Sequence, residues 1–146
     1  MKKIYALLAL ISFFAMTSCE KSPSIGDWPP IELDKQQLTF AAEGGEQTVT
    51  VENYSHWWIN GGYEEAIMVN ERTEYINYVY PTSTEGEGLY IYHLLDGGWY
   101  KVVVPGKTNC NTAVITVAPN NTEEPRQATI IMTVGDTSSH IQINQD

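Results

Sequence analysis

Hydrophobic and polar residues alternate along the C-terminal third of the chain, in three runs over residues 113–117, 128–134 and 140–144. Each run is rich in valine, isoleucine and threonine and is bounded by turn residues such as Gly135 and Asp136. Alternation of this period is typical of half-buried strands. The connections are too short for crossover helices, so we expect neighbouring strands to be antiparallel and to form the end of an all-β sandwich.

The N-terminal part of the predicted domain shows the same period. Leu38 and Phe40 share one face of a predicted strand. Residues 43–45 have the sequence Glu-Gly-Gly and predict a hairpin turn, because glycine accepts a positive φ. The next run, 46–53, places its valines on one face and its threonines on the other, as a half-buried strand does.

A stretch rich in tyrosine and glycine, residues 61–98, separates these strands from the C-terminal ones. Its alternation, and that of the run after it, predicts strands over residues 66–69, 75–80, 89–95 and 99–104. The last two are joined by Asp96-Gly97-Gly98, a sequence typical of a tight hairpin turn. In the strand over 75–80, we expect Ile76, Tyr78 and Tyr80 to share a face.

Two adjacent tryptophans, Trp57 and Trp58, occupy a short run that ends at Asn60. Side chains alternate across a strand, so the two indoles must face opposite sides. One belongs to the core and the other to the outside or beneath a loop, and either of them could be the core residue. An outward tryptophan is a candidate for stacking on a sugar, and cover by the 61–98 insertion is the alternative.

Six of the nine tyrosines lie between residues 63 and 92. Tyrosine is a common strand residue, but it also joins an apolar ring to a polar tip, which suits recognition. Inserted segments on a rigid scaffold often carry binding. An exposed, coplanar pair of rings would distinguish a sugar-binding surface from a protein interface. The carbohydrate-binding candidates are Trp57, Trp58, Tyr63, Tyr78, Tyr80, Tyr90, Tyr92 and Trp99.

The first 18 residues have the features of a bacterial export signal. Two lysines precede an apolar run over 4–16 that is too short to span a bilayer comfortably. The run ends in Met-Thr-Ser before Cys19, which resembles the lipobox of bacterial lipoproteins. Cleavage before Cys19 and acylation of this cysteine are therefore expected, and an ordinary secretory cleavage near Ser18 is the alternative.

Residues 19–30 predict a tether, because they contain three prolines and little periodicity. The domain itself is expected over 31–146, with 61–98 as an insertion. Acyl chains on Cys19 would hold the protein at the membrane without a membrane helix. We therefore expect a lipid-anchored outer-membrane protein, on either the cell-surface or the periplasmic face.

The charge of the chain excludes one class of partner. There are 18 acidic and 8 basic residues, a net charge of −10, and loss of Lys2 and Lys3 with the leader would change it to −12. Nucleic acid needs a basic surface to meet its phosphates, so it is not an expected partner. Adsorption to anionic lipid is excluded for the same reason, and the lipid anchor is the expected membrane contact.

Residues capable of catalysis or metal binding are scattered. His56, His93 and His140 are far apart and show no metal-ligand spacing. No phosphate-binding glycine loop or nucleophile elbow is present, and adjacent carboxylates such as Glu64 and Glu65 do not form the converging pair of a glycosidase. We expect no enzymatic activity, no catalytic residues, no metal and no cofactor.

The C-terminal motif consists of an Ile-Thr-Val strand, an Ala-Pro-Asn turn, an arginine before Ala-Thr-Ile-Ile, and a last strand ending Ile-Gln-Ile-Asn-Gln. It resembles the BACON domain, a name that stands for Bacteroidetes-associated carbohydrate-binding, often N-terminal. The matching positions are Val117, Asn120, Arg126, Ala128, Thr129, Ile130, Ile141 and Gln145. Upstream, residues 38–40, 43–45, 48–51 and Trp57 fit the first strands of that family. The resemblance covers 31–60 and 99–145.

This resemblance implies an immunoglobulin-like antiparallel β-sandwich, here with an inserted β-hairpin region and a preceding signal peptide. It also implies a non-catalytic module of a surface lipoprotein that binds carbohydrate or mucin glycans by aromatic stacking. The alternative is a structural or protein-interaction lipoprotein of the cell envelope without glycan binding, whose partner would be an envelope protein.

Overall fold

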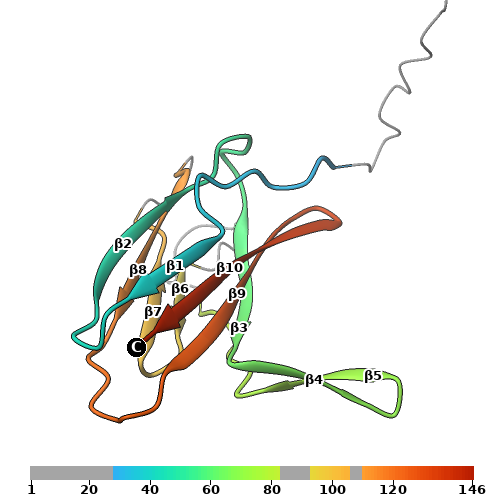
Figure 1. Ribbon diagram of the computed structural model, residues 1–146. Coiled ribbons are helices and arrows are strands. Elements are labelled where there is room, and N and C mark those ends of the chain that lie inside the picture. The colour runs from blue at the N-terminus through green and yellow to red at the C-terminus, as the bar shows by residue number, and fades with distance from the viewer. Residues whose placement is uncertain (1–27, 83–92, 106–109) are drawn as a thin grey trace, which may run out of the picture.

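The computed structural model describes residues 28–82, 93–105 and 110–146, and this part of the chain contains ten strands and no helix (Figure 1). The expected leader and most of the tether, including Cys19, lie outside the described residues. Residues 89–92 of the strand expected over 89–95, with Tyr90 and Tyr92, lie outside them too. Within the described ranges, no helix is long and apolar enough to cross a membrane.

Eight strands form two four-stranded sheets. The first has the order β1 (Gln37–Phe40), β10 (Thr137–Gln145), β9 (Arg126–Val134) and β3 (Trp58–Tyr63). The second has the order β2 (Gly45–Thr50), β8 (Thr112–Val117), β7 (Tyr100–Val103) and β6 (Leu94–Asp96). The other two strands, β4 (Glu65–Val69) and β5 (Arg72–Ile76), form a hairpin inserted after β3. The predicted all-β sandwich is confirmed.

All strand pairs are antiparallel except β1 and β10, which run parallel with Leu38 opposite Ile143. This pair joins the first and last strands of the sandwich, so no short connection dictates its direction. β9 and β10 form the antiparallel pair expected from the sequence, whereas β8 lies in the other sheet. The hairpin at Asp96-Gly97-Gly98 is also confirmed, because β6 pairs antiparallel with β7.

The Glu-Gly-Gly sequence at residues 43–45 is not a hairpin turn. β1 and β2 belong to different sheets, so this turn carries the chain from one sheet to the other, and the hairpin prediction is wrong. Gly44 has a φ of 75°, and a Cβ at this position would lie 2.2 Å from the carbonyl oxygen of Val117. The turn therefore requires glycine, for its backbone conformation and for its lack of a side chain.

The core lies between the two sheets and is built by alternation. In β9, Ala128, Ile130, Met132 and Val134 are buried while the residues between them are only partly covered. The same pattern in β1, β8 and β10 supplies the facing side chains. Each fully buried valine or isoleucine contributes about 1.5–3 kcal/mol relative to exposure, which is enough to hold the sheets face to face.

Trp57 is the core tryptophan. Its ring is only 5% exposed, and its Nε1 donates a hydrogen bond to the carbonyl oxygen of Cys110 at 3.0 Å. Trp58, the first residue of β3, is half-buried and takes the opposite side of the strand. The choice that the sequence left open is decided by this packing.

Polar residues of the C-terminal motif close one end of the sandwich. Gln145 is buried, and its Nε2 donates to the carbonyl oxygens of Ala41, Ala42 and Ala118 at 3.0–3.2 Å. Its Oε1 accepts from Nε of Arg126 at 2.8 Å. These bonds satisfy groups that would otherwise be buried without partners, so they tie the turn before β9 to the last strand.

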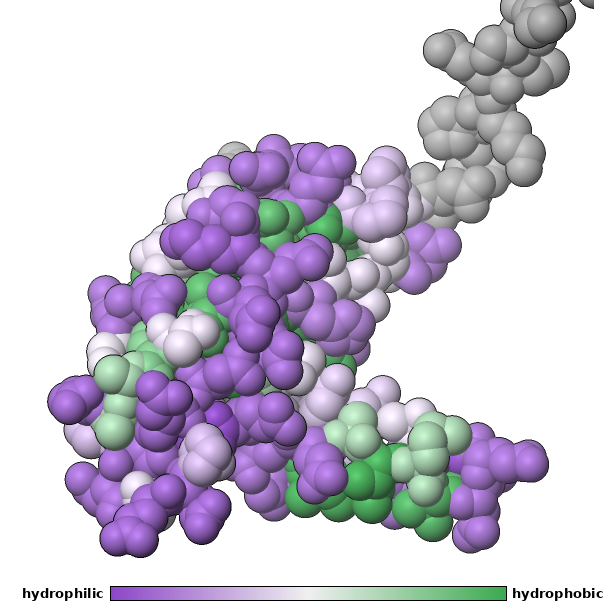
Figure 2. Space-filling view, in the orientation of Figure 1, coloured by the Kyte–Doolittle hydropathy of each residue, from purple (hydrophilic) through white to green (hydrophobic). Residues whose placement is uncertain are grey.

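The β4–β5 hairpin, called the arm below, projects from one end of the sandwich (Figure 1). Figure 2 shows hydrophobic residues gathered over the arm, on a face of the molecule that is otherwise mostly hydrophilic. The indole of Trp28, the first described residue, packs against Gly135 in the β9–β10 turn and lies 6.2 Å from the ring of Tyr54. The β9–β10 turn lies toward the other end of the sandwich from the arm (Figure 1).

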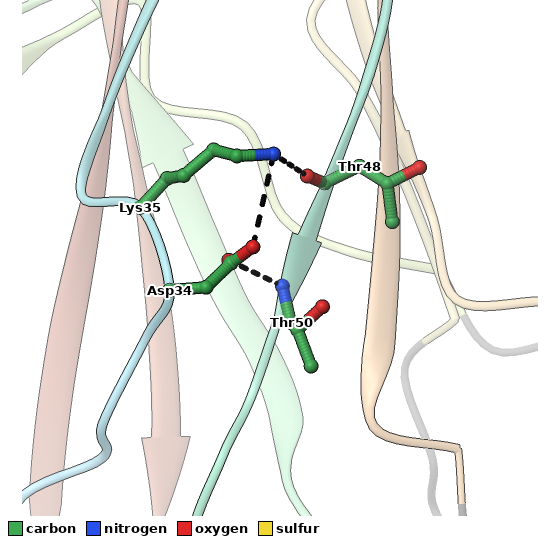
Figure 3. A network of polar contacts seen from close by, with 4 residues as sticks. All are labelled: Asp34, Lys35, Thr48 and Thr50. Atoms are coloured by element: carbon green, nitrogen blue, oxygen red, sulfur yellow. Dashed lines mark hydrogen bonds and ion pairs between the residues drawn. The ribbon is translucent and has the colours of Figure 1, made fainter.

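A polar network fastens the chain before β1 to β2 (Figure 3). The Asp34 carboxylate accepts a hydrogen bond from the backbone N–H of Thr50 at 2.7 Å. Nζ of Lys35 donates to the carbonyl oxygen of Thr48 at 2.8 Å and lies 3.7 Å from the Asp34 carboxylate. Charged groups along an edge strand discourage pairing with another chain, so this edge of the second sheet is protected.

Candidate ligand-binding site

The arm is a two-stranded ribbon with solvent on both faces. Every residue of β5 is exposed, and Met68 in β4 is 69% exposed. Its turn, Asn70 and Glu71, has φ values of 48° and 64°, the conformation that two-residue hairpin turns use to match the twist of their strands. An isolated hairpin of this size is marginally stable in water, so the arm depends on contacts at its base.

Four tyrosines lie in continuous contact where the arm leaves the sandwich, and they are called the tyrosine row. The ring centroids are separated by 4.6 Å between Tyr63 and Tyr75, 5.8 Å between Tyr75 and Tyr78, and 4.8 Å between Tyr78 and Tyr80. Their planes are tilted by 44°, 51° and 64°, so the coplanar pair sought from the sequence is not found in the row. Tyr80 is 77% exposed and Tyr75 is 46% exposed.

The residues that share a face with Tyr78 differ from the predicted ones. We expected Ile76, Tyr78 and Tyr80 to share a face of one strand, but β5 ends at Ile76. Asn77 follows with a φ of 52°, which breaks the alternation between Ile76 and Tyr78. Tyr75 takes the place expected for Ile76 next to Tyr78. The prediction was wrong because it assumed regular backbone through Asn77.

Tyr78 is seated on the backbone of β3. A Cβ on Gly61 would lie 2.2 Å from the phenol oxygen of Tyr78, so the missing side chain of Gly61 provides the seat. The Tyr78 hydroxyl donates to the carbonyl oxygen of Asn60 at 3.3 Å, beside a bulge in β3. Burial raises the pKa of the Tyr78 phenol above its ordinary value, and the adjacent Tyr80 and Tyr75 raise it further.

Glu64 joins the base of the arm to the second sheet. Its carboxylate accepts a hydrogen bond from Nε1 of Trp99 at 2.6 Å and another from Nδ2 of Asn77. The backbone N–H of Glu64 donates to the carbonyl oxygen of Ile76 at 3.1 Å. Hydrogen bonds to a charged group are stronger than neutral ones, so this residue holds both ends of the arm in place.

Trp99 lies beside this junction rather than in the tyrosine row. The guanidinium carbon of Arg126 sits 4.5 Å from the centroid of its ring. Together with Glu64, Glu65 and Gln127, these two residues line a recess of about 350 Å³. Arg126 covers one face of the Trp99 indole, and the indole N–H is hydrogen-bonded to Glu64 at the base of the arm. Trp99 therefore fixes the base of the arm to the sandwich.

A larger groove of about 500 Å³ crosses the outer face of the first sheet and ends at the tyrosine row. It is lined by Gln36, Gln37, Tyr63, Thr129, His140 and Gln142. These side chains come from the segment before β1 and from all four strands, β1, β10, β9 and β3. Tyr63 belongs both to the groove and to the tyrosine row, so the two features form one continuous surface.

The structure therefore brings together three of the predicted carbohydrate-binding candidates, Tyr63, Tyr78 and Tyr80. Trp57 lies in the core, and Trp58 is half-buried at the other end of β3 from Tyr63. Trp99 contacts Glu64 and Arg126 at the base of the arm. Tyr90 and Tyr92 are outside the described residues.

The residues that sequence reasoning missed are Tyr75 and the polar lining of the groove. Tyr75 belonged to the tyrosine cluster in the sequence, but strand alternation placed it on the opposite face from Tyr78. Its place in the tyrosine row depends on the left-handed conformation of Asn77. The groove residues are isolated glutamines and a histidine, which carry no motif. No group of three or more metal-ligating side chains occurs among residues 28–82, 93–105 and 110–146.

Residues 80–146 match the model of the BACON family, described as "Putative binding domain, N-terminal". This match confirms the predicted resemblance to the BACON domain within residues 80–146. The matched range contains β6 to β10 and begins at Tyr80, so the arm and the other three tyrosines of the row precede it. The predicted resemblance over residues 31–60 is outside this range and stays a prediction.

No curated protein matches the chain in sequence. Among solved structures, the NMR structure of a protein from Bacteroides thetaiotaomicron matches with a TM-score of 0.58 and 25% identity, over 88% of this chain and 96% of that one. A Bacteroides ovatus GH5 xyloglucanase in complex with a XXXG heptasaccharide matches at 0.44 and 18% identity, over 79% of this chain and 19% of the enzyme. The chain thus spans about a fifth of that enzyme, and a likeness at this level supports no conclusion.

Proposed function

We propose that this BACON protein is a non-catalytic, lipid-anchored protein of the bacterial envelope that binds plant or mucin glycans through the tyrosine row. The observation that carries the proposal is the continuous contact of Tyr63, Tyr75, Tyr78 and Tyr80 outside the core, with Tyr80 77% exposed. A cluster formed only for packing would cover its rings, whereas this row leaves aromatic surface open to solvent.

The chemistry of tyrosine suits this ligand class. Each ring offers an apolar plate to the C–H faces of a sugar, and its hydroxyl can exchange hydrogen bonds with sugar hydroxyls. A millimolar dissociation constant corresponds to only about −4 kcal/mol, which contact with two exposed rings can supply. The row therefore supports a weak site, of the kind that gains strength when many copies act together on one surface.

Calorimetric titration of the full chain in mild detergent with plant and mucin oligosaccharides tests glycan binding. We expect saturable binding, weakened about tenfold or more by Tyr75→Ala and by Tyr80→Ala. Met68→Ala is the matched control, because Met68 is exposed on the arm without belonging to the tyrosine row. A folded protein that binds none of the glycans would contradict the proposal.

A lipid anchor at Cys19 would present the arm away from the membrane. The support is the packing of Trp28, nine residues after the cysteine, on Gly135 in the β9–β10 turn, because this turn lies toward the end of the sandwich remote from the arm (Figure 1). Incorporation of labelled fatty acid into the native chain but not into Cys19→Ser tests the anchor.

Protease digestion of intact cells tests the outer-membrane location. Loss of the protein indicates that it lies on the cell surface, and survival of the protein indicates that it lies on the periplasmic face.

A second candidate function, binding of an envelope protein, is favoured by the apolar residues of the arm outside the tyrosine row. Met68 is 69% and Ile76 is 39% exposed, and the arm is the most hydrophobic region in Figure 2. Exposed apolar patches often mark protein interfaces. A photo-cross-linker placed at position 68 in cells should give one discrete adduct that Ile76→Ser abolishes, and no adduct would exclude this function.

A further inference from the structure

We propose that the tyrosine row is one end of a longer site, and that the groove on the first sheet binds the continuation of the same ligand, an uncharged, hydroxyl-rich oligosaccharide chain. This inference rests on the proposed glycan-binding function and deepens it. It assigns a binding role to Gln37, Gln142 and Thr129, and it specifies both the charge and the form of the ligand.

Strand register places these residues in one straight line. Gln37 in β1 is paired with Gln142 in β10, Gln142 is paired with Thr129 in β9, and Thr129 is paired with Tyr63 in β3. Directly paired residues project from the same face of a sheet. Neighbouring strands lie about 4.8 Å apart, so the line runs for roughly 14 Å before it reaches the tyrosine row.

The line continues without a break into the aromatic rings. Tyr63 ends the polar line and lies 4.6 Å from Tyr75, which leads through Tyr78 to Tyr80. A ligand that lies along this path contacts amides and a hydroxyl over the sheet and rings at the arm. A single sugar would meet only part of it, so the path fits an extended chain of several sugar residues.

The polar part of the path has the groups that recognise hydroxyls. Gln37 and Gln142 are exposed, and their side-chain amides have no hydrogen-bond partner among the described residues of the protein. Each carboxamide offers two donor hydrogens and an acceptor oxygen, which matches adjacent sugar hydroxyls that both donate and accept. The hydroxyl of Thr129 and the ring of His140 add further polar atoms to the lining.

The charge of the protein selects a neutral ligand. The described residues that line the groove include no lysine or arginine, and the whole chain carries a net charge of −10. A carboxylate or sulfate on the ligand would meet no lysine or arginine among these residues and would be repelled by the acidic surface. Uronic-acid polymers and sialylated chains are therefore the poorer ligands.

The tilt of the rings selects a single chain over a flat crystalline surface. Successive rings of the row are inclined by 44°, 51° and 64° to one another, so they cannot all lie flat on one plane. A soluble chain that twists along its length can follow such a surface. A packed sheet of parallel chains cannot lie flat on two successive rings of the row at once.

Titration of the full chain in mild detergent with soluble neutral and acidic polysaccharides tests the inference. The neutral probes are β-glucan, xylan, galactomannan and desialylated mucin glycans, and the acidic probes are polygalacturonate and sialylated mucin. We expect binding of at least one neutral probe, and Gln37→Ala and Gln142→Ala should each weaken it roughly two- to tenfold. The loss should be smaller with a short oligosaccharide that covers only the rings.

Gln127→Ala is the matched control, because Gln127 is an exposed glutamine of the same sheet that lines the recess beside Trp99 instead of the groove. Unchanged thermal unfolding shows that the variants remain folded. If Tyr75→Ala weakens binding while Gln37→Ala and Gln142→Ala do not, the extended site is wrong and glycan binding by the tyrosine row stands. Stronger binding of an acidic probe overturns the charge assignment, and no binding of any probe overturns both proposals.

Discussion

The indole Nε1 of Trp99 donates a hydrogen bond to the carboxylate of Glu64 at 2.6 Å, across 35 residues of sequence. Trp99 belongs to the β6–β7 turn of the second sheet, whereas Glu64 lies between β3 and β4. The arm follows β3 of the first sheet, so this bond joins the arm to the second sheet. Arg126 covers the same indole at 4.5 Å and connects it to the C-terminal motif through Gln145. The direction of the arm is thus set by a contact outside the arm.

Replacement of Glu64 should loosen the arm. Glu64→Ala removes the acceptor of two hydrogen bonds and leaves the Trp99 N–H without its partner, so we expect a loss of about 1–3 kcal/mol in the free energy of unfolding. Denaturant unfolding measures this loss, and hydrogen exchange of the β4 and β5 amides should become faster. Glu65→Ala is the control, because Glu65 is exposed and adjacent to Glu64. Equal effects of the two substitutions would contradict a specific role for Glu64.

Addition of one methyl group at Gly61 should displace Tyr78. The Cβ of Gly61→Ala would lie 2.2 Å from the Tyr78 phenol oxygen, and the ring has to move outward to make room. We expect a modest loss of about 1 kcal/mol in stability and a larger loss of glycan binding, because Tyr78 links Tyr75 to Tyr80. In a Tyr78→Ala background the same change at position 61 should have little effect. A double-mutant cycle on unfolding free energy measures this coupling, and independent effects would refute the contact.

The turn of the arm carries a conformational strain that glycine would relieve. Glu71 has a φ of 64°, a region that is unfavourable for residues with a side chain. Glu71→Gly should therefore stabilise the arm by about 1 kcal/mol, seen as slower hydrogen exchange of the β4 and β5 amides. Glu74→Gly, within β5, should have the opposite effect, because glycine weakens a strand interior. Faster exchange in Glu71→Gly would contradict the assignment of this turn.

The buried phenol of Tyr100 should make the protein sensitive to alkali. Burial, with a smaller contribution from the charge of Glu64, raises the pKa of Tyr100 to about 12 from an ordinary value of 10.0. A folded pKa above the unfolded one contributes stability that is present below pH 10 and is lost between about pH 10 and 12. The loss is at most about 1.4 kcal/mol per pH unit.

Denaturant unfolding between pH 9 and 12 measures this dependence, and Tyr100→Phe should remove that part of it. The Tyr100 hydroxyl has no hydrogen-bond partner among the described residues, so loss of the oxygen should not lower stability at neutral pH. Lys101→Ala is the neighbouring control, because Lys101 is exposed. The same alkaline slope in Tyr100→Phe would show that another group is responsible.

The class of fold could be predicted because its signal is local. Alternation in residues 128–134 and 140–144 requires only that each strand bury one face, and the structure buries those faces in β9 and β10. The turn at Asp96-Gly97-Gly98 was predictable for the same reason, since its residue types suit only a few conformations. Sheet assignment was not predictable, because alternation does not reveal which strand is the neighbour.

The site was predictable only as a concentration of tyrosine between residues 63 and 92. The left-handed conformation of Asn77 decided that Tyr75 joins Tyr78 and Tyr80, and no periodic pattern signals such a break. Packing between the sheets, rather than the order of two adjacent indoles, decided that Trp57 is in the core.

By itself, the sequence determined the strands, the acidic charge and the supply of aromatic rings in this protein. The tertiary structure alone decided that Gln37, Gln142, Thr129 and Tyr63 lie in one line. The physical reason is that cross-strand neighbours are chosen by the register of whole strands, which depends on the packing of both sheets at once.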